Sequence, residues 1–138
     1  MKTLLLTIVG VLTLSAEAQQ KDYPIHTVPF TQVKLTDNFW LPRIETNRTV
    51  TIPASFERCK NTGRMKNFEM AAKHSGKFCT TYPFDDTDIY KTIEGASFSL
   101  AVHPDKALEA YLDSLIAMIK NAQEPDGYLY TARTIDPA

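Results

Sequence analysis

Apolar positions are most regular in the second half of the chain. Over residues 87–102 they recur every three or four residues, which predicts a helix. His103 and Pro104 interrupt this pattern, and Pro104 is predicted to begin a second helix that ends before the turn at residues 125–127. The second helix carries a broad apolar face made of Leu108, Tyr111, Leu112, Leu115, Met118, Ile119 and Ala122. The short connection predicts an antiparallel helical hairpin.

The lead-in to these helices has a weaker pattern. Loose alternation over residues 30–35 predicts a short irregular or strand-like segment. Asp37 or Thr36 is predicted to cap a turn that holds Phe39 and Trp40, after which residues 42–52 are predicted to be helical.

Further helices are expected in the middle of the chain. Pro53 is predicted to restart or kink the helical path, because proline has no amide to donate to the preceding turn. A helix over residues 54–59 is predicted to stop at residues 62–63, and another is predicted over residues 67–74.

These patterns together predict an all-α fold with residues 19–36 as a lead-in and residues 37–138 as a helical domain. The absence of a repeated strand–helix pattern disfavours a nucleotide-binding sheet. The apolar face of the last long helix is broader than one partner helix can cover. The sequence therefore predicts part of a larger helical assembly whose carboxy-terminal part is missing from the 138 residues.

Residues 1–18 have the features of a secretory signal peptide. A positive start is followed by the apolar residues 4–14 and by a small-x-small cleavage pattern at residues 16–18. The apolar core has roughly half of the ~20 residues that a membrane span requires, and no later segment is long enough. The sequence predicts an exported protein, periplasmic or secreted, without a membrane span.

Composition narrows the possible partners. The formal net charge is -1 and the basic residues form no cluster, which disfavours a nucleic-acid partner. Two cysteines, Cys59 and Cys79, are equally compatible with a disulfide and with two free thiols. A zinc site needs about four ligands, and two cysteines twenty positions apart without clustered histidines supply too few. No metal site is therefore predicted in this chain.

Three aspartates, Asp85, Asp86 and Asp88, stand directly before the regular helix. One of them is predicted to cap the helix, since an acceptor there stabilises it by roughly 0.5–2 kcal/mol. A calcium loop counted from Asp86 would place Lys91 and Ser97 at its sixth and twelfth positions, where glycine and glutamate are required. A sugar-nucleotide D-x-D site is a weaker alternative, because the motif is short.

The remaining alternative is the wall of a sugar pocket. On a helix Asp88 lies near Lys91, and Tyr90 lies near Glu94, so donors and acceptors alternate on the surface. Sugar hydroxyls need such groups, and the apolar ring faces need aromatic neighbours such as Phe84. A solvated face of paired charges has the same spacing and stays open as an alternative.

Two sequence blocks carry a family resemblance. F-x-D-T-D-x-Y-K-x-x-E lies within FDDTDIYKTIEGASFSLAVHPD, and A-Q-x-x-D-G-Y-L lies within IKNAQEPDGYLYT. With the approach VKLTDNFWLPRIETNR, they resemble the amino-terminal part of glycoside hydrolase family 127 over about residues 33–131. The order and separation of the blocks make the match more specific than either block alone.

The resemblance implies an (α/α)6 toroid and a β-L-arabinofuranosidase-like activity on plant polysaccharides or glycoproteins. In that family the nucleophile is a zinc-bound cysteine with further Cys and Glu ligands, and a separate glutamate acts as acid and base. These groups lie downstream of the matched region, so no catalytic residue is assigned here and this chain alone is expected to be inactive. Zinc is expected only in the full-length enzyme, and Cys59 and Cys79 do not correspond to its ligands.

The resemblance assigns substrate contacts to the acidic stretch. The predicted carbohydrate-binding residues are Phe84, Asp86, Asp88, Tyr90, Lys91 and Glu94. Two alternatives remain at this point: a non-catalytic carbohydrate-binding or scaffold protein, and part of another (α/α)6 carbohydrate-active enzyme.

Overall fold

The computed structural model describes residues 25–137. It divides into two units between Val33 and Lys34. In the first unit Phe30–Gln32 form a 3-10 turn, η1, so the strand-like segment predicted here is wrong. The amide of Val33 donates to the carbonyl of Phe30 (3.0 Å), and this local bond takes the place of pairing with another strand. The predicted signal peptide, residues 1–18, lies outside the described residues.

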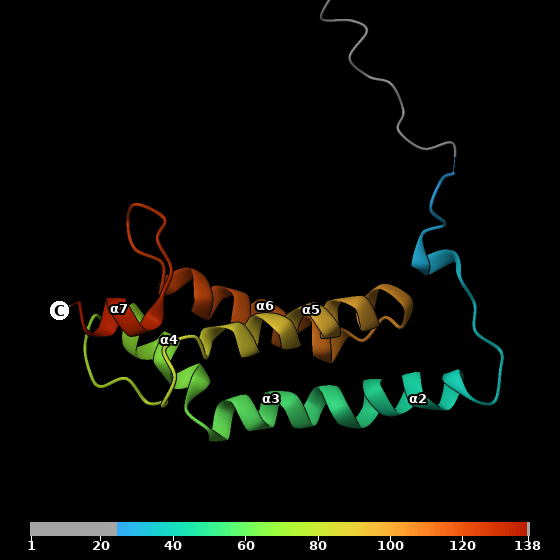
Figure 1. Cartoon of the computed structure of the whole chain (residues 1–138), viewed down its shortest axis with the longest axis horizontal. Coiled ribbons are helices and arrows are strands. Elements are labelled where there is room, and N and C mark those ends of the chain that lie inside the picture. Colours follow the sequence, from blue (N-terminus) through green and yellow to red (C-terminus); the bar gives the residue numbers. More distant parts are fainter. Residues whose placement is uncertain (1–24, 138) are drawn as a thin grey trace, which may run out of the picture. The chain divides into compact units, whose positions relative to one another are not determined.

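The second unit consists of helices. In chain order they are α2 (Trp40–Thr46), the π-helix η2 (Asn47–Thr51), α3 (Ile52–Asn61), α4 (Arg64–Ala72), α5 (Asp86–Val102), α6 (Lys106–Asn121) and α7 (Thr131–Ile135). Figure 1 shows α2, η2 and α3 following one another as a rod, with α5 and α6 alongside. No strand occurs between residues 25 and 137, and the all-α prediction is confirmed for this part of the chain.

Asp37 accepts backbone amides at the start of the rod, as predicted, and Pro53 lies in the first turn of a new helix. The Asp37 Oδ1 atom accepts the amides of Phe39 (2.8 Å) and Trp40 (2.5 Å), and these bonds lower the pKa of its carboxyl. The α-helix widens into the π-helix η2, and α3 then begins with Pro53 in its first turn. The first turn tolerates proline because an amide there needs no partner in the preceding turn.

A left-handed glycine allows α4 to follow α3 at once. Gly63 has φ +85°, a conformation that glycine adopts without steric cost, and α4 begins at Arg64. The helix predicted over residues 67–74 therefore starts three residues earlier and ends at Ala72. The predicted stop at residues 62–63 is confirmed.

The predicted hairpin of α5 and α6 is confirmed, with one correction at its turn. The two helices lie side by side and are joined by residues 103–105 (Figure 1). Pro104 does not begin α6, because Asp105 occupies the N-cap position. Its Oδ1 atom accepts the amides of Ala107 (3.0 Å) and Leu108 (3.1 Å), two donors that proline cannot satisfy.

The core is centred on α4, which contacts α3, α5, α6 and α7. Phe68 on α4 and Ile89 on α5 are completely buried. The other buried apolar residues are Ile52, Phe56, Cys59, Met65, Ala71, Ala96, Leu112, Leu115 and Ala122. Because these come from α3, α4, α5, α6 and the residue after α6, the helices share one core.

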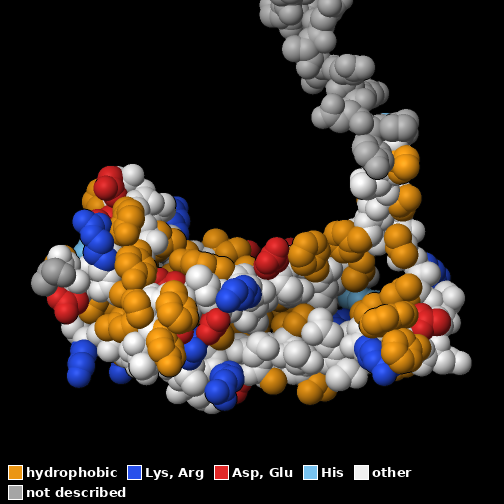
Figure 2. All heavy atoms as spheres, in the orientation of Figure 1, with side chains coloured by type: hydrophobic (Ala, Val, Ile, Leu, Met, Phe, Trp, Pro, Cys, Tyr) orange, Lys and Arg blue, Asp and Glu red, His pale blue; other side chains and the backbone are white. Residues whose placement is uncertain are grey.

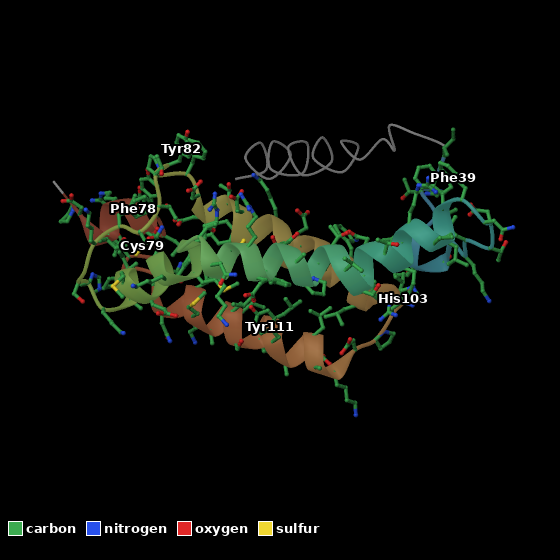
Figure 3. The ribbon with its side chains drawn as sticks, turned by 90° about the horizontal axis from the view of Figure 1, so that it is seen from below. Phe39, Phe78, Cys79, Tyr82, His103 and Tyr111 are labelled. Atoms are coloured by element: carbon green, nitrogen blue, oxygen red, sulfur yellow. The ribbon has the colours of Figure 1, made fainter. Side chains whose placement is uncertain are left out.

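The apolar face of α6 packs against α3 and α4 along part of its width. Tyr111 packs edge-on against Phe56 of α3, with ring centroids 5.1 Å apart, and its hydroxyl lies 3.8 Å from the sulfur of Met65 on α4. Figure 3 shows Tyr111 where α6 lies beside the rod that contains α3. Leu112, Leu115 and Ala122 are buried, whereas Leu108, Tyr111, Met118 and Ile119 are only partly buried and Ile116 is 52% exposed. The described residues thus cover the apolar face of α6 only in part.

We expect Gly63→Ala to destabilise the helical unit. An added Cβ at Gly63 would lie 2.9 Å from the Cβ of Cys79, and alanine would also adopt a positive φ. The left-handed conformation alone costs roughly 1–2 kcal/mol. Urea denaturation measures the loss in the free energy of unfolding. The matched control is Gly95→Ala within α5, where a Cβ meets open space, and it should stabilise by roughly 0.5–1 kcal/mol. Equal stability of Gly63→Ala and the parent chain would contradict the strain expected at this position.

Candidate functional site

Arg64, the first residue of α4, links two of the three aspartates. Its Nε atom donates to Oδ2 of Asp88 (2.6 Å), and its terminal nitrogens reach Oδ1 of Asp85 (3.3 Å) and Oγ1 of Thr62 (2.8 Å). The hydrogen bond to Asp88 raises the pKa of the guanidinium above its ordinary value. Arg64 thereby offsets the negative charge at the start of α5.

This arrangement corrects the predicted helix cap. The N-terminus of α5 has no side-chain cap hydrogen bond, and Asp85 has helical backbone angles (φ -66°, ψ -13°). A capping side chain requires an extended backbone that turns its oxygen toward the free amides. Asp85 and Asp88 instead face Arg64.

Asp86 is directed toward α7. Its Oδ2 atom accepts the amide of Thr131 (2.9 Å) and its Oδ1 atom accepts the hydroxyl of Thr131 (2.6 Å). Asp86 is buried and Thr131 completely so. Burial raises the pKa of the Asp86 carboxyl, while the two bonds from Thr131 oppose that rise. The described contacts give Asp86 the role of an anchor between α5 and α7.

Asp88 and Lys91 line a pocket between α3 and α5 whose residues are mostly polar or charged. The pocket has a volume of about 250 Å³. Its lining residues are Ser55, Arg58, Cys59, Arg64, Asp88, Lys91 and Thr92. Figure 2 shows basic and acidic side chains gathered over the end of α3 and the first half of α5. The Lys91 Nζ atom lies 3.7 Å from Oδ1 of Asp88 and donates to the Thr87 hydroxyl (3.3 Å).

The other predicted contact residues do not line this pocket. Tyr90 packs edge-on against Phe68 with ring centroids 5.8 Å apart, and burial raises the pKa of Tyr90 to about 12. Phe84 is exposed and stacks on Tyr82 at 5.3 Å. Glu94 is exposed on α5. Only Asp88 and Lys91 are thus brought together in the pocket, and sugar contact by all six residues stays a prediction.

A buried amide fixes the loop before the acidic stretch. Asn67, completely buried on α4, donates to the Thr80 hydroxyl (3.0 Å) and accepts the amide of Cys79 (2.7 Å). Figure 3 shows Cys79 and Tyr82 on this loop. Neither Asn67 nor Arg64 was identified from the sequence. The three neighbouring aspartates indicate that a basic residue should lie close to them. The sequence does not show which basic residue this is, because Arg64 lies 24 positions before Asp88.

The cysteines do not form a metal centre. Both are free thiols, Cys59 buried and Cys79 exposed, and burial raises the pKa of the Cys59 thiol. Among residues 25–137 no three His, Cys, Asp or Glu side chains group in a way that could hold a metal ion. These residues therefore do not fit the zinc centre that the resemblance implies for the complete enzyme. None of the described helices combines the length and the apolar character needed to cross a membrane.

Comparisons with known proteins give consistent matches. The family model described as the β-L-arabinofuranosidase GH127 catalytic domain matches residues 32–137. A non-reducing end β-L-arabinofuranosidase from Bifidobacterium longum subsp. longum is 48% identical over 48 residues, which cover 35% of this chain and 7% of that protein.

Two solved structures are similar along most of the chain. A GH127 β-arabinofuranosidase is 56% identical with a TM-score of 0.79, covering 83% of this chain and 18% of that one. A GH127 β-L-arabinofuranosidase from Geobacillus stearothermophilus is 32% identical with a TM-score of 0.72, covering 76% and 18%. The chain thus spans less than a fifth of these relatives. The matches confirm the predicted fold class, the amino-terminal portion of an (α/α)6 toroid.

We expect Asp86→Asn to change how stability depends on pH. Because the folded-state pKa of Asp86 is raised above its ordinary value of 3.8, the folded state binds this proton more tightly than the unfolded state. The resulting stabilisation is fully present below pH 3.8 and is lost as pH rises through the folded-state pKa. Urea denaturation across this range should show a steeper decline for the parent chain than for Asp86→Asn. Asp113→Asn on the exposed side of α6 is the matched control. Parallel pH profiles for parent and Asp86→Asn would contradict the raised pKa.

Proposed function

Because the chain belongs to the GH127 β-L-arabinofuranosidase family, we propose that it supplies the amino-terminal helices of an exported enzyme that hydrolyses L-arabinofuranosides of plant polysaccharides or glycoproteins. The observation that carries this proposal is the match of the catalytic-domain model to residues 32–137. The signal-peptide pattern of residues 1–18 supports export to the periplasm or beyond the cell.

The proposed contribution of this segment is sugar binding through Asp88. Arg64 holds Oδ2 of Asp88, which fixes the orientation of the carboxylate. Oδ1 faces Lys91 at 3.7 Å, beyond hydrogen-bond distance, and can accept a bond from a sugar hydroxyl. The side chain of Asp88 is 41% exposed, so a ligand can reach it. Asp86 and Tyr90 support this position from the core side of α5, and Phe84 offers an exposed ring.

The catalytic groups are proposed to lie outside the described residues. Residues 25–137 hold no cluster of potential metal ligands. The resemblance implies that the nucleophile and the acid/base glutamate follow the matched region, which supports this proposal. We therefore expect no hydrolysis by this chain alone. The alternatives, a non-catalytic carbohydrate-binding protein and another (α/α)6 enzyme, are less favoured because the family model is that of a GH127 catalytic domain.

The first test is activity of the gene product that carries this segment, together with any coding sequence that follows residue 138. It should release L-arabinose from β-L-arabinofuranosides and leave the α-linked isomers intact, as measured by chromatography of the products. Binding of the β-linked sugar without release would favour the carbohydrate-binding alternative, and release of a different sugar would overturn the proposal.

In that gene product Asp88→Asn should weaken sugar binding and leave the fold intact. Losing a hydrogen bond to a charged group costs about 1.5–3 kcal/mol, which corresponds to roughly a 10- to 100-fold fall in kcat/KM. Asparagine keeps an oxygen for Arg64, so the Tm should change little. Steady-state kinetics and thermal unfolding measure the two effects, with Asp113→Asn as control. A lower Tm with unchanged kinetics would instead give Asp88 a purely structural role.

A further inference from the structure

We propose that the pocket between α3 and α5, lined by Arg58, Arg64, Asp88 and Lys91, binds a carboxylate-bearing sugar, a uronic acid, next to the arabinofuranosyl group. This inference rests on the proposed function, because it names a second sugar class for the same polymer. It follows from the charge of the pocket and from the hydroxyl groups that accompany it.

The pocket holds more positive than negative charge. Three cations line it, Arg58, Arg64 and Lys91, whereas the only lining carboxylate is Asp88. Asp85 lies outside this lining but pairs with Arg64, so that three cations stand against two carboxylates even when it is counted. An anionic ligand would neutralise the remaining positive charge, and a neutral ligand would not.

Two of the cations are available to a ligand. Within residues 25–137 the structure gives the Arg58 side chain neither a hydrogen bond nor an ion pair, and Arg58 is exposed at the pocket rim. Lys91 is 71% exposed, and its nearest carboxylate oxygen lies at 3.7 Å. Arg64 is different, because Asp85 and Asp88 already engage its guanidinium. An incoming carboxylate would therefore meet Arg58 and Lys91, and a planar guanidinium matches a carboxylate with two parallel bonds.

The same pocket provides acceptors for sugar hydroxyls. The hydroxyls of Ser55 and Thr92 donate to the carbonyls of Thr51 and Asp88. Thr92 also contacts the Cys59 thiol, and each hydroxyl oxygen keeps at least one lone pair that can accept. Inorganic anions need only donors, whereas a uronic acid needs donors for its carboxylate and acceptors for its ring hydroxyls. The mixed lining therefore favours the sugar acid over a simple anion.

The test is a titration of the isotope-labelled full chain with D-galacturonate, followed by amide chemical shifts. D-galactose is the matched neutral sugar and acetate is the matched carboxylate without hydroxyls. Galacturonate should shift the amides of Ser55, Arg58 and Thr92 and bind more tightly than both controls. Raising the salt concentration should weaken it, since mobile ions screen exposed charges over about 10 Å.

Variants assign the binding to the two available cations. Arg58→Gln and Lys91→Gln should each weaken galacturonate binding about threefold, and the double variant about tenfold. Lys120→Gln on α6 is the matched control and should leave binding unchanged. Thermal unfolding of each variant verifies that the fold is retained.

The outcomes separate this inference from the proposed function. Equal binding of galacturonate and galactose, equal binding of acetate, no binding, or unchanged binding by the double variant would each overturn the uronic-acid site. Hydrolysis of β-L-arabinofuranosides by the longer gene product would survive any of these results. Failure of that hydrolysis, with galacturonate bound as expected, would instead overturn the proposed function.

Discussion

The packing of one nine-residue helix determines the rest of the helical unit. α4 contacts α3, α5, α6 and α7, and its Phe68 is completely buried among them. A buried aromatic ring of this kind contributes several kcal/mol to stability, so the neighbouring helices cannot move independently. The adjacent Asn67 fixes the position of the loop that leads to α5, because its side-chain amide forms hydrogen bonds with Cys79 and Thr80. A buried amide must be satisfied, and this requirement fixes where the acidic stretch begins.

The same helix, α4, contributes both Phe68 to the core and Arg64 to the pocket. Arg64 is the first residue of α4, and it lies beside Asp85 and Asp88 because α4 packs against the start of α5. Close carboxylates repel one another, and a shared guanidinium reduces that repulsion. Asp86 is instead buried against Thr131, whose amide donates to its carboxylate. The acidic stretch thus combines one buried anchor, Asp86, with two aspartates that pair with Arg64, although the three are neighbours in sequence.

Local signals account for what was predicted correctly. Helical periodicity located α5, and Asp37 and Gly63 marked the start and stop of helices, because caps and left-handed turns depend on few neighbours. The family resemblance, based on two motifs, agreed with the match over residues 32–137. The predicted cap of α5 was wrong because Asp85 and Asp88 pair with Arg64, whereas two other errors arose where two local choices competed. At Phe30–Gln32 a 3-10 turn replaced the predicted extended structure, and at the start of α6 the Asp105 cap prevailed over Pro104.

The sequence by itself determined the helical class, the order of the helices up to α6, the family and the three acids before α5, whereas it did not indicate α7. Periodicity and motif spacing are properties of neighbouring residues and need no tertiary contact to be recognised. Only the tertiary structure decided which partner each acid received: Arg64 for Asp85 and Asp88, and Thr131 for Asp86. These partners lie 21 to 45 positions away from the acids, and pairing over such separations is set by how the helices pack.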